Sequence, residues 1–267
     1  MNIVFLFSGQ ARTSPFSVNP SPKSVRILDS YNKFIFTEKF KSLYKYKIYI
    51  STCDLNLDIT NEYFGDINVG NIHLFYKSYY KKNIVSPLIH IREYYKKYKD
   101  NPDWAEGYII YLPQCIEQQY KILDCYNLFI NDSENDINRK NCDFIIRMRL
   151  DTEFEMDLCD ILDGFKENPK LEIAMCWDWG LIGKPEVMDM VCTGLDNNYG
   201  KFGYDIDISY IPEYFHEVYS WDKKRWKYAH ERQMFEMIFT YFYERGIDMN
   251  DAIRISVPFH FVDIVRE

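Results

Sequence analysis

The chain has 267 residues, of which 47% are hydrophobic, 27% charged and 18% aromatic. This composition excludes a disordered chain, and no apolar run reaches the roughly 18 residues that a membrane-spanning helix needs. The formal net charge is −8, with +4 in residues 1–150 and −12 in residues 151–267. An acidic chain is a poor general binder of phosphate backbones, so nucleic acid is excluded as a general partner. The uneven charge suits an anionic ligand in the first half and a cation in the second.

The first half of the chain predicts strands alternating with helices. Strands are predicted at Ile3–Phe7, Tyr46–Thr52 and Ile72–Tyr76 because these runs are short and apolar. Helical spacing of apolar residues predicts helices over 25–35 and 107–130.

The second half continues the alternation. Strands are predicted at Cys142–Leu150 and Leu171–Trp177, and an extended segment at Ile253–Val262. A helix is predicted from Pro185, since proline fits a first helical turn. A second helix is predicted over Tyr228–Arg245. Alternating strands and helices indicate an α/β sheet that binds its ligands at the carboxyl ends of the strands.

The seven cysteines are scattered, and no two of them form a C-x-x-C pair. A zinc knuckle or thioredoxin-type motif is therefore not expected. Because the first residues also lack a basic leader, we expect reduced thiols and a cytoplasmic protein.

The most informative stretch ends the strand at Cys142–Leu150. Asp151 and Glu153 follow two arginines and stand two residues apart, so on an extended backbone they project to one side. Paired carboxylates suit Mg²⁺ or Mn²⁺. The alternative is an exposed strand face, with the acids outside and Phe154 inside.

Five segments together carry a resemblance to a known family. They are Ser8–Arg12 after the first strand, Asp151–Glu153, Cys176–Glu186, His230-Glu231 at the start of a long helix, and His260 near the C-terminus. In this order they resemble a GT-A-fold glycosyltransferase, the nucleotide-sugar-dependent kind found in polysaccharide and viral glycan synthesis. The chain has Asp-x-Glu where that family commonly has Asp-x-Asp.

The resemblance implies a GT-A-like α/β fold with a Rossmann-type mixed central sheet flanked by helices. It implies one catalytic domain over 1–267, with a nucleotide-binding half (1–150) and a metal and acceptor half (151–267). The expected activity is hexosyl or pentosyl transfer from a nucleoside diphosphate sugar, with uridine as the commonest base, to a hydroxyl of a glycan.

The resemblance also implies roles for single residues. Asp151, Glu153 and His260 are the expected ligands of Mn²⁺ or Mg²⁺. Glu231 is the first choice for the base that deprotonates the acceptor, and Asp178, between two tryptophans, is the second. The expected nucleotide-sugar residues are Ser8, Gly9, Gln10, Arg12, Arg147, Arg149, Trp179 and Gly180.

Three other readings stay open. A sulfotransferase is suggested by the loop that follows the first strand, although Pro15 and Pro20 disfavour the helix such a loop needs. A nucleotidyltransferase would share the fold and the acidic pair, and a non-catalytic glycan-binding module would need neither metal nor basic loop.

The sugar, the acceptor, the stereochemical course and the oligomeric state are not encoded in any motif. The abundance of Lys, Asn, Ile, Tyr and Phe fits the AT-rich genome of a large DNA virus or a bacterium.

Overall fold

The chain forms two compact units, and all strands of its main sheet lie in the first. The first unit comprises Met1–Ile72, Lys121–Met188 and Asp251–Glu267, and the second comprises His73–Tyr120 and Asp189–Asn250. The computed structural model describes residues 1–9, 11, 14–52, 55–65, 67–69, 112–134, 136–176, 179–194, 230–255 and 262–264. The division of roles between 1–150 and 151–267 stays a prediction.

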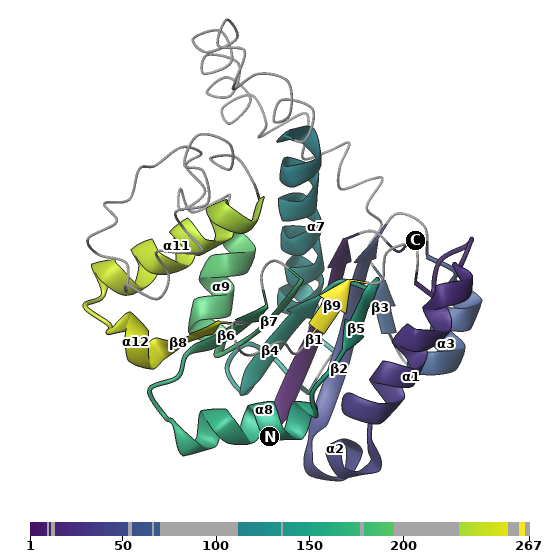
Figure 1. The fold of residues 1–267 in the computed structure, drawn as a ribbon, viewed down its shortest axis with the longest axis horizontal. Coiled ribbons are helices and arrows are strands. Elements are labelled where there is room, and N and C mark those ends of the chain that lie inside the picture. The colour runs from purple at the N-terminus through teal and green to yellow at the C-terminus, as the bar shows by residue number, and fades with distance from the viewer. Residues whose placement is uncertain are drawn as a thin grey trace, which may run out of the picture. The chain divides into compact units, whose positions relative to one another are not determined.

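The first unit is built on a seven-stranded sheet in the order β3-β2-β1-β4-β7-β6-β8 (Figure 1). The strands are β1 (Asn2–Gly9), β2 (Lys45–Thr52), β3 (Ile67–Val69), β4 (Phe144–Met148), β5 (Thr152–Phe154), β6 (Ile173–Cys176), β7 (Gly180–Gly183), β8 (Ile253–Ile255) and β9 (Val262–Ile264). Strand β1 pairs in parallel with β2 and β4, whereas β7 runs antiparallel to β4 and β6. Strands β5 and β9 form a separate antiparallel pair.

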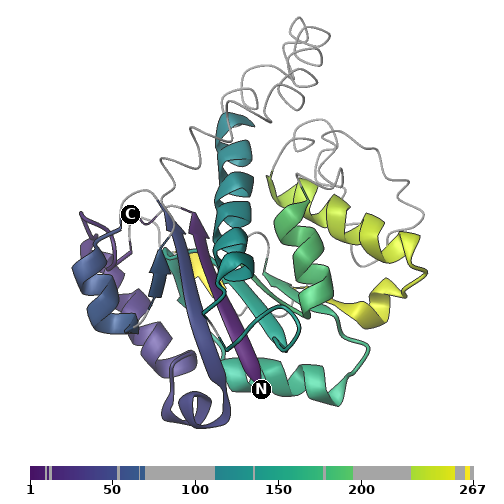
Figure 2. The same cartoon turned by 180° about the vertical axis from the view of Figure 1, so that it is seen from behind.

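Helices cover both faces of the sheet. The helices of the described residues are η1 (Pro22–Ser24), α1 (Val25–Phe34), α2 (Glu38–Leu43), α3 (Leu57–Phe64), α7 (Leu112–Asn131), α8 (Leu158–Glu167), α9 (Pro185–Thr193), α11 (His230–Glu244) and α12 (Met249–Ala252), of which α11 belongs to the second unit. Opposite views show α1 and α8 on one face and α7 on the other (Figures 1 and 2). The predicted α/β class, with a mixed central sheet flanked by helices, is therefore confirmed.

Polar residues begin several of these helices. The side chains of Thr37, Asn56 and Asp157 accept backbone N–H groups in the first turns of α2, α3 and α8, which satisfies donors that a helix start leaves without partners. Asp157 starts α8 three residues after β5 ends at Phe154.

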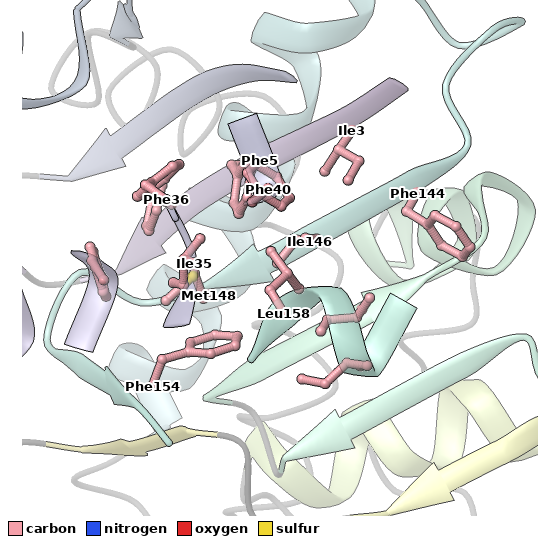
Figure 3. Packing of buried hydrophobic residues seen from close by; sticks show 14 of the residues in the cluster. Ile3, Phe5, Ile35, Phe36, Phe40, Phe144, Ile146, Met148, Phe154 and Leu158 are labelled. Carbon is pink, nitrogen blue, oxygen red and sulfur yellow. The ribbon is translucent and has the colours of Figure 1, made fainter. Parts of the chain in front are cut away.

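The core of the first unit fills the face beneath α1, α2 and α8. Phe5 and Phe7 of β1 lie there with Ile146 and Met148 of β4, and all four are at most 1% exposed. Figure 3 shows Phe5, Ile146 and Met148 near Phe36, Phe40, Phe154 and Leu158, which come from elements far apart in the sequence. At roughly 1.5–3 kcal/mol per fully buried large apolar side chain, burial on this face strongly stabilises the unit.

Most predicted elements match the structure. Strands β1, β2, β4 and β6 and helices α1, α7, α9 and α11 lie where the sequence predicts them, while the predicted strand at Ile72–Tyr76 lies outside the described residues. The short elements β3, β5, β7 and α2 were not predicted, and neither was the ten-residue α8. Among the residues that the structure describes, no helix is both long and apolar enough to cross a membrane.

Candidate functional site

The carboxyl ends of β1 and β4 flank the point where the order of the strands reverses. From β1 the chain continues to β2 on one side, whereas β4 lies on the other side. Open α/β sheets bind ligands at such a switch point, outside the carboxyl ends of the strands. Ser8 and Gly9 end β1 there, and Arg149 and Asp151 follow β4.

A bidentate ion pair stands at this edge. Arg149 donates through Nε to Asp151 Oδ1 at 2.8 Å and through Nη2 to Asp151 Oδ2 at 2.6 Å. The side chains are 20% and 8% exposed, so the pair is shielded but not sealed from solvent. Such fork-to-fork pairs are short, strong and geometrically specific.

The backbone of Arg149 is also held in place. Its N–H donates to the carbonyl of Trp179 at 3.3 Å, and its carbonyl accepts from Thr152 Oγ1 at 2.6 Å. Trp179 is thereby held beside the end of β4, where Gly180 pairs with Met148. The guanidinium therefore extends from a rigid anchor.

Gly9 makes room for this arginine. It has a φ of 127°, a backbone conformation that L-residues with side chains rarely adopt, and a Cβ there would lie 3.4 Å from Arg149 Cγ. The stem of Arg149 thus passes over the end of β1. Glycine is required by the backbone conformation, while a Cβ would meet Arg149 at an ordinary van der Waals distance.

The second carboxylate also faces an arginine. Glu153 Oε2 lies 2.6 Å from Nη2 of Arg26, a residue of α1 that is 64% exposed. Thr152 and Phe154 on either side of Glu153 are at most 1% exposed, as the alternative of a strand face with its acids outside expects, whereas Asp151 is itself buried. Arg26 was missed, since nothing in its local sequence points to Glu153.

The C-terminal strand runs alongside the acidic pair. Strand β9 pairs with β5, and its register places Asp263 opposite Glu153. The sequence prediction took His260 as the C-terminal metal ligand, and no motif pointed to the pairing of β9 with β5. His260 lies outside the described residues.

The donor chemistry of Asp151 and Glu153 fits a hard divalent cation, because both offer carboxylate oxygens. Within the described residues no three His, Cys, Asp or Glu side chains cluster as metal ligands. Arg149 and Arg26 already balance the charge of the two carboxylates. A cation at this position would therefore have to compete with Arg149 for Asp151.

A row of polar groups lies on the α7 face of the sheet, just inside this edge. Arg147 is fully buried and donates through Nε to Ser8 Oγ at 3.0 Å, while Ser51 Oγ donates to Asp124 Oδ2 at 2.6 Å. Ser8 and Ser51 are register partners on β1 and β2. Burial raises the pKa of Asp124 and outweighs the opposing effect of the Ser51 hydrogen bond.

The structure brings most of the described candidates together. Those at the ends of β1 and β4 or in the adjoining turn are Ser8, Gly9, Arg147, Arg149, Asp151, Trp179 and Gly180. Gln10, Arg12, Asp178 and His260 lie outside the described residues. Glu231 is the second residue of α11, in the second unit.

Comparison with known proteins gives little more. No protein-family model and no curated protein matches the chain in sequence. Among solved structures, it is similar to apo mouse xyloside xylosyltransferase 1, with a TM-score of 0.43 and 8% identity over 96% of this chain and 85% of that one. This likeness is too slight to assign a fold family or an activity.

Proposed function

We propose that the chain is a glycosyltransferase that moves a sugar from a nucleoside diphosphate sugar, with uridine as the expected base, to a hydroxyl of a glycan. The observation that carries the proposal is the Arg149–Asp151 pair over Gly9, at the switch point between β1 and β4. An anchored guanidinium at that place suits a diphosphate, since its fork matches phosphate oxygens. The GT-A family stays a prediction.

The transfer itself needs charge and a proton acceptor. The acceptor oxygen bonds to the anomeric carbon as the bond from that carbon to the diphosphate breaks, and the hydroxyl proton leaves to a carboxylate. Arg149 would bind the diphosphate, on which negative charge develops. A bound Mn²⁺ or Mg²⁺ would supply further positive charge there, and Asp151, Glu153 and His260 are the residues expected to hold it.

For the carboxylate that takes the proton, Glu231 remains the first candidate and Asp178 the second. Glu231→Gln keeps the shape of the side chain but removes its basicity. If Glu231 is the base, transfer falls by about 10²–10⁴-fold while donor binding is unchanged. If only Asp178→Asn has that effect, the role moves to Asp178.

The proposal is tested by incubating the protein with Mn²⁺ and a panel of nucleotide sugars and measuring the released nucleoside diphosphate. We expect slow hydrolysis of one donor, and loss of that release in Asp151→Asn. The matched control is Glu155→Gln, which removes an exposed acid four residues along the chain. Release that is equal in both variants, or absent with every donor, contradicts the proposal.

The same assay separates the alternative functions. A nucleotidyltransferase would release pyrophosphate from a nucleoside triphosphate, and a sulfotransferase would bind a sulfonate donor in place of a nucleotide sugar. A glycan-binding module would bind sugars with no nucleotide requirement. Calorimetry with UDP, with and without Mn²⁺, completes the comparison by measuring donor-site affinity directly.

A further inference from the structure

Helix α1 holds the segment that follows β4. Arg26 forms an ion pair with Glu153 at 2.6 Å. One turn later, the Ser30 hydroxyl oxygen accepts the backbone N–H of Phe154 at 3.0 Å, in a buried contact. An ion pair and a hydrogen bond therefore join α1 to strand β5.

The next residue of α1, Tyr31, contacts the turn that bears the Arg149–Asp151 ion pair. Its hydroxyl donates to the carbonyl of Arg149 at 3.4 Å, a long hydrogen bond, and is also hydrogen-bonded to the side chain of Thr152. Thr152 Oγ1 donates to the same carbonyl at 2.6 Å. Two hydroxyl groups thus meet at one backbone carbonyl, which belongs to the residue whose guanidinium forms the ion pair.

The core leaves Tyr31 little freedom to move. Its side chain is fully buried, and its ring centroid lies 6.0 Å from that of Phe7 and 6.4 Å from that of Phe16. Burial raises the pKa of Tyr31 well above its usual value, so the phenol keeps its proton and remains a donor at physiological pH. Thr152 is fully buried as well, so water does not replace either hydroxyl as a partner of the carbonyl.

Stability alone does not account for hydroxyl groups at these two positions. Burying a polar group costs free energy unless it is hydrogen-bonded, whereas Phe and Val have nearly the same shapes and no polar side-chain atom. The two hydroxyls fix the backbone of Arg149, from which the guanidinium and, two residues later, the Asp151 carboxylate extend. A misplacement of about 1 Å in such a group costs an enzyme about a hundredfold in rate.

We propose that Tyr31 is a positioning residue, which acts with Thr152 to hold Arg149 and Asp151 in the geometry that binds the ligand. Tyr31 touches no ligand itself, because it is buried, and it acts through the carbonyl of Arg149. Its effect on the ion pair is a property of the ligand-free protein. Its effect on donor binding rests on the proposed function.

The substitutions Tyr31→Phe and Tyr49→Phe form a matched pair that tests the inference. Each removes the hydroxyl of a fully buried tyrosine and leaves the ring in place. The Tyr49 hydroxyl donates to Asp132 Oδ2 at 2.9 Å, and its ring packs 5.7 Å from that of Phe129 in α7. We expect both variants to unfold at a lower urea concentration than the parent, so a loss of stability is common to the two.

An NMR signal of Arg149 separates positioning from stability. In the ligand-free protein, the bond from Arg149 Nε to Asp151 Oδ1 at 2.8 Å should slow exchange of that proton with water and give a ¹H–¹⁵N signal. The signal is assigned by its loss in Arg149→Gln. It should broaden or disappear in Tyr31→Phe and persist in Tyr49→Phe.

Calorimetry with UDP and Mn²⁺ measures the consequence for the ligand. Affinity should fall by about three- to tenfold in Tyr31→Phe, as for one lost hydrogen bond, and stay unchanged in Tyr49→Phe. Thr152→Val, which removes the hydroxyl and nearly keeps the shape, should reproduce both effects of Tyr31→Phe. Thr152→Ser, which keeps the hydroxyl, should restore the Arg149 signal and the UDP affinity.

An unchanged Arg149 signal in Tyr31→Phe would overturn the inference, because Tyr31 would then only fill the core. Equal changes of signal and affinity in Tyr31→Phe and Tyr49→Phe would also overturn it, since loss of stability would explain both. A parent protein that binds no UDP would contradict the proposed function instead, and the Arg149 signal would still decide the role of Tyr31. The two proposals therefore fail separately.

Discussion

Strands β1, β2 and β4 differ in the side chains that they present on the two faces of the sheet. Toward α1 and α8, β1 and β4 offer Phe5, Phe7 and Met148. Toward α7 the alternate positions offer the buried Val4, Leu6 and Ile145 and, nearer the carboxyl ends of the strands, Ser8 and Arg147, which lie beside the Ser51–Asp124 hydrogen bond. Because successive residues of a strand project to opposite sides, one short stretch of sequence specifies both faces.

The difference between the two faces distinguishes side chains that stabilise the fold from side chains that stability alone does not explain. Burying apolar rings stabilises the fold, whereas burying a charge costs free energy unless it is paired and hydrogen-bonded. A polar row inside the sheet is therefore not explained by stability alone. It lies just below the switch point, so we infer that it supports the ligand site.

The apolar face is tested by Phe7→Ala, which should have the largest effect on stability. Phe7 is fully buried and packs its ring 5.4 Å from that of Phe64 and 6.0 Å from that of Tyr31. We expect the free energy of unfolding to fall by about 3–5 kcal/mol in urea denaturation. The control Leu43→Ala, at a 53% exposed position, should change it by no more than about 0.5 kcal/mol.

The ligand side of the comparison is tested by Arg149→Gln. This change removes two charge-assisted hydrogen bonds to Asp151 and the cation expected to meet the diphosphate. Hydrogen bonds to charged groups contribute about 1.5–3 kcal/mol, so UDP affinity measured by calorimetry should fall by roughly 10–100-fold. In Arg139→Gln, where the pair with Glu186 is long at 3.8 Å, affinity should be unchanged. Equal affinities in the two variants would remove Arg149 from the site.

A pair of glycines separates backbone strain from ligand binding. Gly9 and Gly65 both have positive φ, at 127° and 76°, but only at Gly9 would a Cβ contact another residue, Arg149. Alanine at either position should lower the free energy of unfolding by about 1–3 kcal/mol, the typical cost of a strained backbone conformation. Only Gly9→Ala should also weaken UDP binding. If Gly65→Ala weakens it equally, the effect is one of stability.

The elements that sequence analysis predicted best are those with long apolar runs. Strands β1 and β2 have eight residues each, and their hydrophobic stretches stand out against polar flanks. Strands β3 and β5 have only three residues, too few for any period to appear. Tertiary pairing, rather than local pattern, determines them.

The site residues also divide into those that a local sequence pattern predicts and those that only tertiary packing brings together. Asp151 and Arg149 were predicted because their pattern lies within one strand end. Ser51 and Asp124 are 73 residues apart in sequence, and only the packing of α7 on β2 brings them together. A single sequence contains no local trace of such a contact, and the same holds for Arg26 and Glu153.

The smallest expected effect concerns Asp124, which accepts a hydrogen bond from Ser51 on the α7 side of the sheet. Because burial raises the pKa of its carboxyl in the folded protein, the folded state holds that proton more tightly than the unfolded chain does. The stability linked to this proton is complete below the unfolded pKa and is lost as the pH rises through the folded pKa.

Asp124→Asn cannot titrate and still accepts a hydrogen bond from Ser51, so it should gain stability relative to the parent between acidic and neutral pH. Ser51→Ala should strengthen the parent's pH dependence, since it removes the hydrogen bond that favours the charged form. Urea unfolding across this pH range measures the free energy of unfolding of both variants. A change with pH of the opposite sign would show that a charged Asp124 stabilises the fold.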